Sequence, residues 1–129
     1  MSENTKQLIM IVDDAKTIRR AGQMFLEEAG YVVAFAEDGF SALSAIQENR
    51  PDLILLDIMM PKLDGYQTCH LIKSNEDFKD IPVVMISSND GPFDAVVGQL
   101  WGCDDYVTKP FKKDALLKTV KLQLEKRNS

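Results

Sequence analysis

Five short apolar runs, each followed by a stretch with apolar residues at helical spacing, set the pattern of this chain. Runs of branched aliphatic residues are typical of buried strands, and apolar residues three and four positions apart are typical of helices. The pattern predicts strands at residues 8–12, 31–35, 53–57, 83–86 and 105–108. It predicts helices at about 16–29, 40–49, 65–74, 92–101 and 112–126. We therefore expect strand and helix to alternate throughout.

The third strand indicates how the sheet is built. Residues 53–56 are consecutive aliphatic side chains with no polar alternation, as in a strand buried on both faces of a parallel sheet. Strand–helix alternation also predicts a parallel sheet with helices on both faces. The common five-stranded solution is the flavodoxin-like doubly wound (βα)5 fold, with strand order 2-1-3-4-5. We predict an α/β protein with that order.

The last two helices have apolar stripes that predict their buried sides. In the fourth helix these are Phe93, Val96, Val97 and Leu100, and in the fifth they are Leu116, Leu117, Val120 and Leu124. These stripes are expected to pack on the sheet.

Polar side chains follow four of the predicted strands. Asp13 and Asp14 follow the first, Asp57 ends the third, Ser87 follows the fourth and Lys109 follows the fifth. An Asp at a strand end often only caps the next turn, but here the other strands supply partners. Because the carboxyl ends of parallel strands meet at one edge of the sheet, we expect these side chains to converge there.

Three carboxylates at one place repel one another. A pair ~4 Å apart costs roughly 4 kcal/mol at an effective dielectric near 20. Such a cluster is tolerated when a hard cation binds it, and carboxylate and phosphate oxygens suit Mg²⁺. With the metal bound, the Asp57 carboxylate can attack phosphorus, while Lys109 supplies positive charge and Ser87 a hydroxyl. The pattern therefore predicts a Mg²⁺-dependent phosphoryl acceptor.

Composition limits the size of the protein and its partners. A chain of 129 residues, 45% of them hydrophobic, can bury one core. No apolar run approaches the roughly 20 residues of a membrane span, and residues 2–6 are too polar for a secretory leader. A net charge of −5 argues against nucleic acid as a partner. Cys69 and Cys103 lack metal-ligand spacing and are expected to be small apolar residues. We expect a cytoplasmic protein without membrane insertion.

Four motifs spread along the chain resemble those of response-regulator receiver domains, the CheY-like module of two-component and chemosensory signalling. They are Val12-Asp13-Asp14; Leu56-Asp57-Ile58-Met59-Met60-Pro61 with Asp64-Gly65; Ile86-Ser87-Ser88; and Tyr106-Val107-Thr108-Lys109-Pro110-Phe111. Each motif alone has little specificity, but the four in this order are a strong indication. The resemblance implies a single receiver domain over residues 1–129, with its core at about 8–126 and no output domain.

The resemblance assigns roles to the acidic residues. Asp57 would accept a phosphoryl group from a phosphohistidine of a partner histidine kinase. Asp13 and Asp14 would hold Mg²⁺ together with Asp57 and the backbone carbonyl of Met59. The protein would not be an enzyme beyond Mg²⁺-dependent phosphoryl acceptance and self-dephosphorylation.

Further implied roles concern the response to phosphorylation. Lys109 would contact the phosphoryl group, aimed by a cis peptide bond to Pro110. Ser87 would be the switch hydroxyl and Tyr106 the switch aromatic, although Tyr106 alone reads equally well as an ordinary strand aromatic. An output face on the fourth helix, fifth strand and fifth helix would comprise Ala95, Gln99, Tyr106, Thr108 and Lys112.

Two positions are expected to set the lifetime of the phosphoryl group. In receiver domains the side chains two residues after the phosphorylated Asp and two after the switch hydroxyl influence the hydrolytic water. Here they are Met59 and Asn89. A thioether has no hydrogen-bond donor and is a weak acceptor, so Met59 predicts slow self-dephosphorylation.

A closer resemblance lies in residues 18–20, 57–69 and 87–94, which are similar to single-domain regulators of type IV pilus chemosensory systems. It implies twitching-motility control and a downstream effector in the pilus or motility machinery. A flagellar-chemotaxis-type or other stand-alone receiver is the alternative.

Other classes match less well. A Mg²⁺-dependent aspartyl-phosphate phosphatase of the haloacid-dehalogenase type would need a second Asp at the position of Met59. A flavin or nucleotide carrier would need a phosphate-binding loop after the first strand, where Asp13 and Asp14 would repel a phosphate. A DNA-binding regulator would need an output domain.

Overall fold

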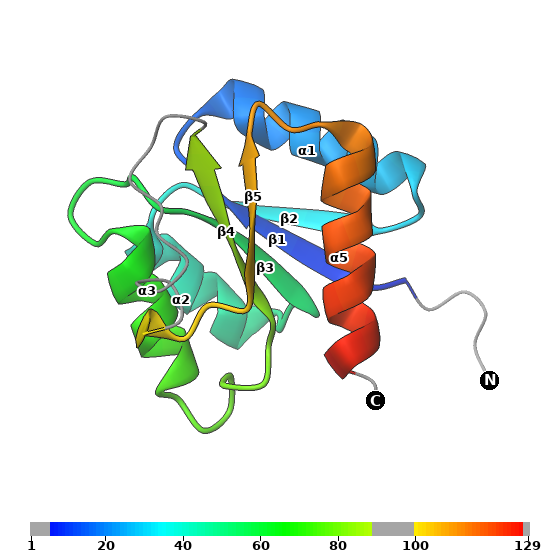
Figure 1. Ribbon diagram of the computed structural model, residues 1–129. Coiled ribbons are helices and arrows are strands. Elements are labelled where there is room, and N and C mark those ends of the chain that lie inside the picture. The colour runs from blue at the N-terminus through cyan, green and yellow to red at the C-terminus, as the bar shows by residue number, and fades with distance from the viewer. Residues whose placement is uncertain (1–5, 89–99, 128–129) are drawn as a thin grey trace.

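The computed structural model describes residues 6–88 and 100–127, and at its centre is a five-stranded parallel sheet (Figure 1). The strands are β1 (Leu8–Val12), β2 (Val32–Ala36), β3 (Leu53–Asp57), β4 (Val83–Ser88) and β5 (Asp105–Lys109). They pair in the order β2-β1-β3-β4-β5, which confirms the predicted flavodoxin-like topology. The direction of strand progression reverses between β1 and β3, where α/β sheets of this kind place their sites.

Helices cover both faces of this sheet, as predicted. One face carries α1 (Lys16–Glu28) and α5 (Lys113–Arg127), and the other carries α2 (Gly39–Glu48) and α3 (Gly65–Lys73) (Figure 1). Each of the four lies close to its predicted bounds. Within residues 6–88 and 100–127, no helix has the length and apolar character needed to cross a bilayer.

Alternate residues of the strands divide the core into two parts. In β3, Ile54 and Leu56 pack in the part covered by α2 and α3, whereas Leu53 and Leu55 pack in the part covered by α1 and α5. All four are fully buried, which explains the lack of polar alternation in the sequence. The predicted stripe of α5 is also confirmed: Leu116, Val120 and Leu124 are buried, and Leu117 is partly so.

Three strands differ from the prediction at their ends. β2 begins and ends one residue later than expected, while β4 extends to Ser88 and β5 to Lys109. Ser87 pairs with Thr108 and Ser88 with Lys109, so the ladder continues through polar residues. Strand pairing uses backbone groups, so a ladder can extend past the residues that the side-chain pattern indicates.

The predicted burial of Leu100 is wrong. Its side chain is 80% exposed, and the neighbouring Trp101 contacts α3 instead, with its ring 6.2 Å from Tyr66 and 5.7 Å from His70. Successive helical residues point about 100° apart, so Leu100 and Trp101 cannot both face α3. The aromatic ring of Trp101, although still 36% exposed, makes this contact. The other three residues of that stripe lie outside the described residues.

Both cysteines behave as apolar core residues, as predicted. Cys69, a residue of α3, is fully buried in the core covered by α2 and α3, and Cys103 packs against the same cluster. Burial raises the pKa of the Cys69 thiol to about 12, and burial followed by the charges of Asp104 and Asp105 raises the pKa of Cys103. Both thiols are therefore protonated at neutral pH.

Gly65 allows α3 to start directly against the end of β3. A Cβ at this position would lie 2.3 Å from the Asp57 carbonyl oxygen and 2.7 Å from the Ile58 Cα. Both are backbone atoms that cannot rotate away, so only glycine fits. The helix start is fixed further by a capping box between Asp64 and Gln67. These contacts hold the loop that follows Asp57.

Candidate functional site

Three carboxylates meet at the carboxyl edge of the sheet. Asp13 follows β1, Asp14 is its neighbour, and Asp57 ends β3; one oxygen of each lies within 4.8 Å of the others. Asp13 and Asp57 are buried, whereas Asp14 is exposed. The repulsion expected among three carboxylates is therefore concentrated on the Asp13–Asp57 pair, because water screens Asp14.

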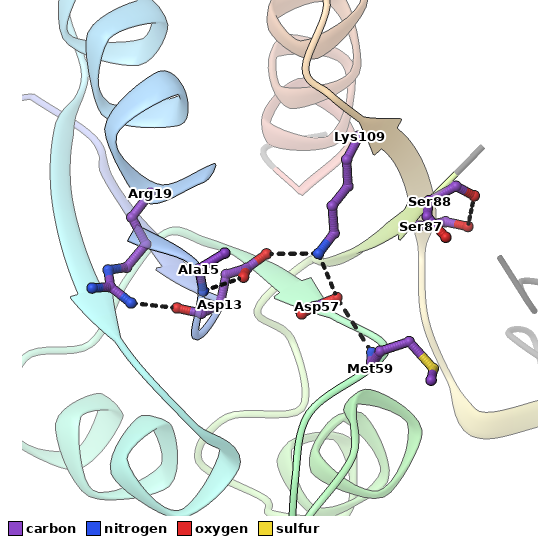
Figure 2. A network of polar contacts seen from close by, with 8 residues as sticks. All are labelled: Asp13, Ala15, Arg19, Asp57, Met59, Ser87, Ser88 and Lys109. Atoms are coloured by element: carbon purple, nitrogen blue, oxygen red, sulfur yellow. Dashed lines mark hydrogen bonds and ion pairs between the residues drawn. The ribbon is translucent and has the colours of Figure 1, made fainter. Parts of the chain in front are cut away.

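Lys109 provides the positive charge at this cluster. Its Nζ lies 3.2 Å from Asp57 Oδ1 and 3.3 Å from Asp13 Oδ2 (Figure 2). Lys109 is the last residue of β5, and its side chain extends from there to the carboxylates. The peptide bond between Lys109 and Pro110 is cis, as the resemblance implied. One ammonium thus bridges two buried carboxylates.

The electrostatics of the cluster are unbalanced without a further cation. Burial, and then the charge of Asp13, raise the pKa of Asp57 to about 6, although Lys109 and the Met59 N–H oppose the rise. Burial alone would lower the pKa of Lys109, but Asp13 and Asp57 together raise it, so this ammonium remains charged. One positive charge is not enough to keep the Asp57 carboxyl in its ordinary range.

The donor set fits a hard divalent cation. Among the described residues, Asp13 Oδ2 is buried without a hydrogen-bond partner, and Lys109 Nζ forms an ion pair with it at 3.3 Å. A buried carboxylate oxygen without a donor is costly, and carboxylate oxygens at this spacing match the ligands that Mg²⁺ takes. The residues present therefore suit the ion that the receiver resemblance implies.

Backbone groups set the orientation of the two buried carboxylates. The Ala15 N–H donates to Asp13 Oδ1 at 2.8 Å, and the Met59 N–H donates to Asp57 Oδ1 at 3.3 Å (Figure 2). Arg19 Nη1 donates to the Asp13 backbone carbonyl at 2.7 Å. The sequence named residues 18–20 only through the subfamily resemblance and gave Arg19 no role at the site, although its position in the first helix after Asp13 and Asp14 was a usable indication.

The predicted switch residues, Ser87 and Tyr106, lie on the neighbouring strands β4 and β5. Ser87 is buried, and its hydroxyl donates to the Ser88 carbonyl at 3.1 Å (Figure 2). The Tyr106 side chain is 46% exposed on β5. Met59 is 63% exposed beside Asp57, so its thioether reaches solvent at the mouth of the site.

Part of the predicted output face can be located. Tyr106, Thr108 and Lys112 line one open groove of about 310 Å³ between β5 and α5. Ala95, Gln99 and Asn89 lie outside the described residues. The groove is separate from the acidic cluster.

Comparison with known proteins agrees with this geometry. The response regulator receiver domain model matches residues 9–121. The chain is 52% identical over 113 residues to protein PilG of Pseudomonas aeruginosa, covering 88% of this chain and 84% of PilG. It is 39% identical over 124 residues to the probable transcriptional regulator ycf27 of Guillardia theta, covering 96% of this chain but only 48% of that relative.

A solved structure agrees as well. The chemotaxis protein CheY4 of Vibrio cholerae matches with a TM-score of 0.85 and 30% identity, covering 92% of this chain and 98% of CheY4. Order of strands, placement of the acidic residues and family match therefore converge: the chain belongs to the response regulator receiver domain family.

Proposed function

We propose that this protein is a phosphorylation-dependent switch that accepts a phosphoryl group on Asp57 from the phosphohistidine of a histidine kinase. The observation that carries the proposal is the buried Asp57 carboxylate, 3.2 Å from Lys109 Nζ and grouped with Asp13 and Asp14. Receiver family membership supports the same reaction.

The chemistry needs little more than positioning and charge neutralisation. An oxygen of Asp57 forms a bond to phosphorus while the phosphorus–nitrogen bond of the phosphohistidine breaks, and the imidazole leaves with the electron pair. Lys109 stays beside the transferred group and balances its charge, and the Ser87 hydroxyl rotates from the Ser88 carbonyl to a phosphoryl oxygen. Asp13, Asp14, Asp57 and the Met59 carbonyl would hold Mg²⁺, which supplies additional positive charge when bound.

Signal output would follow from a two-state surface. Movement of the Ser87 hydroxyl leaves space that Tyr106 occupies, which changes the groove shared by Tyr106, Thr108 and Lys112. Ala95 and Gln99 would complete this face. An effector shifts such an equilibrium only by its differential affinity for the two states.

We further propose that the effector belongs to the pilus or motility machinery and that the protein acts in the cytoplasm. The 52% identity to PilG, together with the subfamily residues at 18–20 and 57–69, supports twitching motility over flagellar chemotaxis. Beyond phosphoryl acceptance, its own chemistry would be self-dephosphorylation tuned by Met59 and Asn89. A phosphatase of the haloacid-dehalogenase type is disfavoured because Met59 offers no acid.

A phosphotransfer assay tests the proposal. Wild-type protein, Asp57→Asn and the exposed control Asp77→Asn are incubated with Mg²⁺ and a panel of radiolabelled phosphorylated histidine kinases. Wild type and Asp77→Asn should gain a hydroxylamine-labile phosphoryl group, and Asp57→Asn should gain none. Equal labelling of Asp57→Asn, or no labelling of wild type by any kinase or by phosphoramidate, would refute the assignment.

A further inference from the structure

Arg19 makes a direct contact with the backbone that carries the acidic pair. Its Nη1 donates to the Asp13 carbonyl at 2.7 Å, and its side chain is only 16% exposed (Figure 2). Charged donors make shorter and stronger hydrogen bonds than neutral ones. Its contact with Glu37 is weak by comparison, at 3.9 Å to a side chain that is 76% exposed. The carbonyl of Asp13 is thus the main partner of this guanidinium.

The N–H, the carbonyl and Oδ1 of Asp13 each form a hydrogen bond, and Arg19 supplies the one to the carbonyl. The Asp13 N–H donates to the Ala36 carbonyl at 3.1 Å, and Oδ1 accepts from the Ala15 N–H at 2.8 Å. The residue before α1 is Ala15, which has no side-chain acceptor, and Asp13, two positions earlier, accepts from its backbone N–H. Without Arg19 the Asp13 carbonyl would be free to turn.

Turning that carbonyl would also turn Asp14. The peptide bond between Asp13 and Asp14 is planar, so the direction of the Asp13 carbonyl fixes the direction of the Asp14 N–H. Asp14 is exposed, and packing therefore does little to orient its carboxylate. Figure 2 shows Arg19 approaching Asp13 from the side opposite Lys109, so the two cations hold different parts of the same residue.

We propose that Arg19 is a positioning residue that preorganises Asp13 and Asp14 for a divalent cation, an inference that rests on the proposed function. Groups outside the direct ligands orient those ligands, and their loss weakens metal binding. Arg19 acts here on the backbone of one carboxylate residue and, through one peptide plane, on the next.

The sign of the effect separates positioning from simple charge. Arg19 is itself positive, so removing its charge near an acidic cluster should by electrostatics alone strengthen Mg²⁺ binding. Loss of positioning should weaken it. Arg20 is the matched control, because it is the adjacent arginine of α1 and its side chain is exposed.

Isothermal titration calorimetry with Mg²⁺ alone tests the inference on wild type, Arg19→Gln and Arg20→Gln. Arg19→Gln should bind Mg²⁺ about tenfold more weakly, which is the smallest loss of affinity typical when a group that orients metal ligands is removed. Arg20→Gln should bind as tightly as wild type or slightly more tightly. Equal or tighter binding by Arg19→Gln would overturn the inference.

Two further arms keep the result interpretable. Circular dichroism checks folding; if Arg19→Gln is unfolded, Arg19→Met decides, since it keeps an unbranched stem but has no donor for the Asp13 carbonyl. Reduced Mg²⁺ affinity of folded Arg19→Met supports positioning, and wild-type or tighter affinity overturns it. Phosphoramidate labelling at saturating Mg²⁺ should be nearly normal in Arg19→Gln. Wild type that binds Mg²⁺ but is never labelled contradicts the proposed function, whereas a labelled wild type with unchanged Arg19→Gln affinity contradicts only the role of Arg19.

Discussion

Lys109 Nζ lies 3.2 Å from Asp57 Oδ1, so the residue that ends β5 forms an ion pair with the residue that ends β3. The same ammonium is 3.3 Å from Asp13 Oδ2. One cation therefore serves two buried carboxylates, and the balance of charge at this edge of the sheet determines both stability and ion binding.

Lys109→Met should have opposite effects on stability and on Mg²⁺ affinity. In metal-free buffer at pH 7 the free energy of unfolding should fall by about 2 kcal/mol, because two buried carboxylates lose their counter-charge. Mg²⁺ should bind more tightly, since a competing cation has been removed. Urea unfolding and calorimetry measure the two quantities, with the exposed Lys118→Met as control. Unchanged Mg²⁺ affinity would show that Lys109 does not compete with the ion.

Asp57→Asn should show that the ionised Asp57 carboxylate lowers the free energy of unfolding of the metal-free protein as the pH rises. The pKa of Asp57 is about 6 in the folded state against 3.8 as the ordinary value, so the folded state holds the proton more tightly. Stability from this group is fully present below about pH 4 and is lost as pH rises through about 6. The stability of Asp57→Asn relative to wild type should therefore rise by about 2–3 kcal/mol across that window.

Urea denaturation of both proteins from pH 4 to 7 without divalent cations measures this difference. The exposed Asp77→Asn should show a nearly constant difference from wild type over the same range. A difference for Asp57→Asn that is flat or falls with pH would contradict the buried, uncompensated state of Asp57.

Lys73 fastens the end of α3 to the starts of β4 and β5. Its Nζ lies 2.8 Å from Asp104 Oδ2 and donates to the Ile81 carbonyl at 2.7 Å, and Asp104 in turn accepts from the Val83 N–H at 2.8 Å. Lys73→Met should lower the free energy of unfolding by about 2 kcal/mol, because several partly buried acceptors lose a charged donor. Lys79→Met removes only an exposed pair with Glu76 and should cost less than about 0.5 kcal/mol. Urea unfolding measures both changes, and similar losses of unfolding free energy in Lys73→Met and Lys79→Met would contradict the structural role of Lys73.

Met59→Asn should shorten the lifetime of the phosphoryl group on Asp57. Met59 is 63% exposed beside the carboxylate, where an amide can hydrogen-bond a water in line with the bond to phosphorus and a thioether cannot. Decay of radiolabelled protein in Mg²⁺, with the kinase removed, measures the lifetime. Met24→Asn changes an equally exposed methionine (59%) on α1 and should decay like wild type. A lifetime unchanged or longer in Met59→Asn would exclude this role.

Sequence pattern alone was sufficient for the architecture and for the identity of the clustered residues. The uninterrupted aliphatic residues 53–56 require burial on both faces, and strand–helix alternation then leaves few topologies. Once β1 neighbours β3, Asp13 and Asp57 must end at the same edge, because parallel strands share their direction. These conclusions depend only on periodicity and connectivity, which are local properties of the chain.

Other features were decided by tertiary packing. Whether Leu100 or Trp101 faces α3 depends on the rotation of a short segment against its neighbours, which periodicity does not determine. The reach of Lys73 to Asp104 and of Arg19 to the Asp13 carbonyl depends on distances between separately formed elements. The exposure of Asp14 beside two buried carboxylates has the same origin. Long polar side chains can adopt many rotamers, and only the surrounding backbone selects the one that is observed.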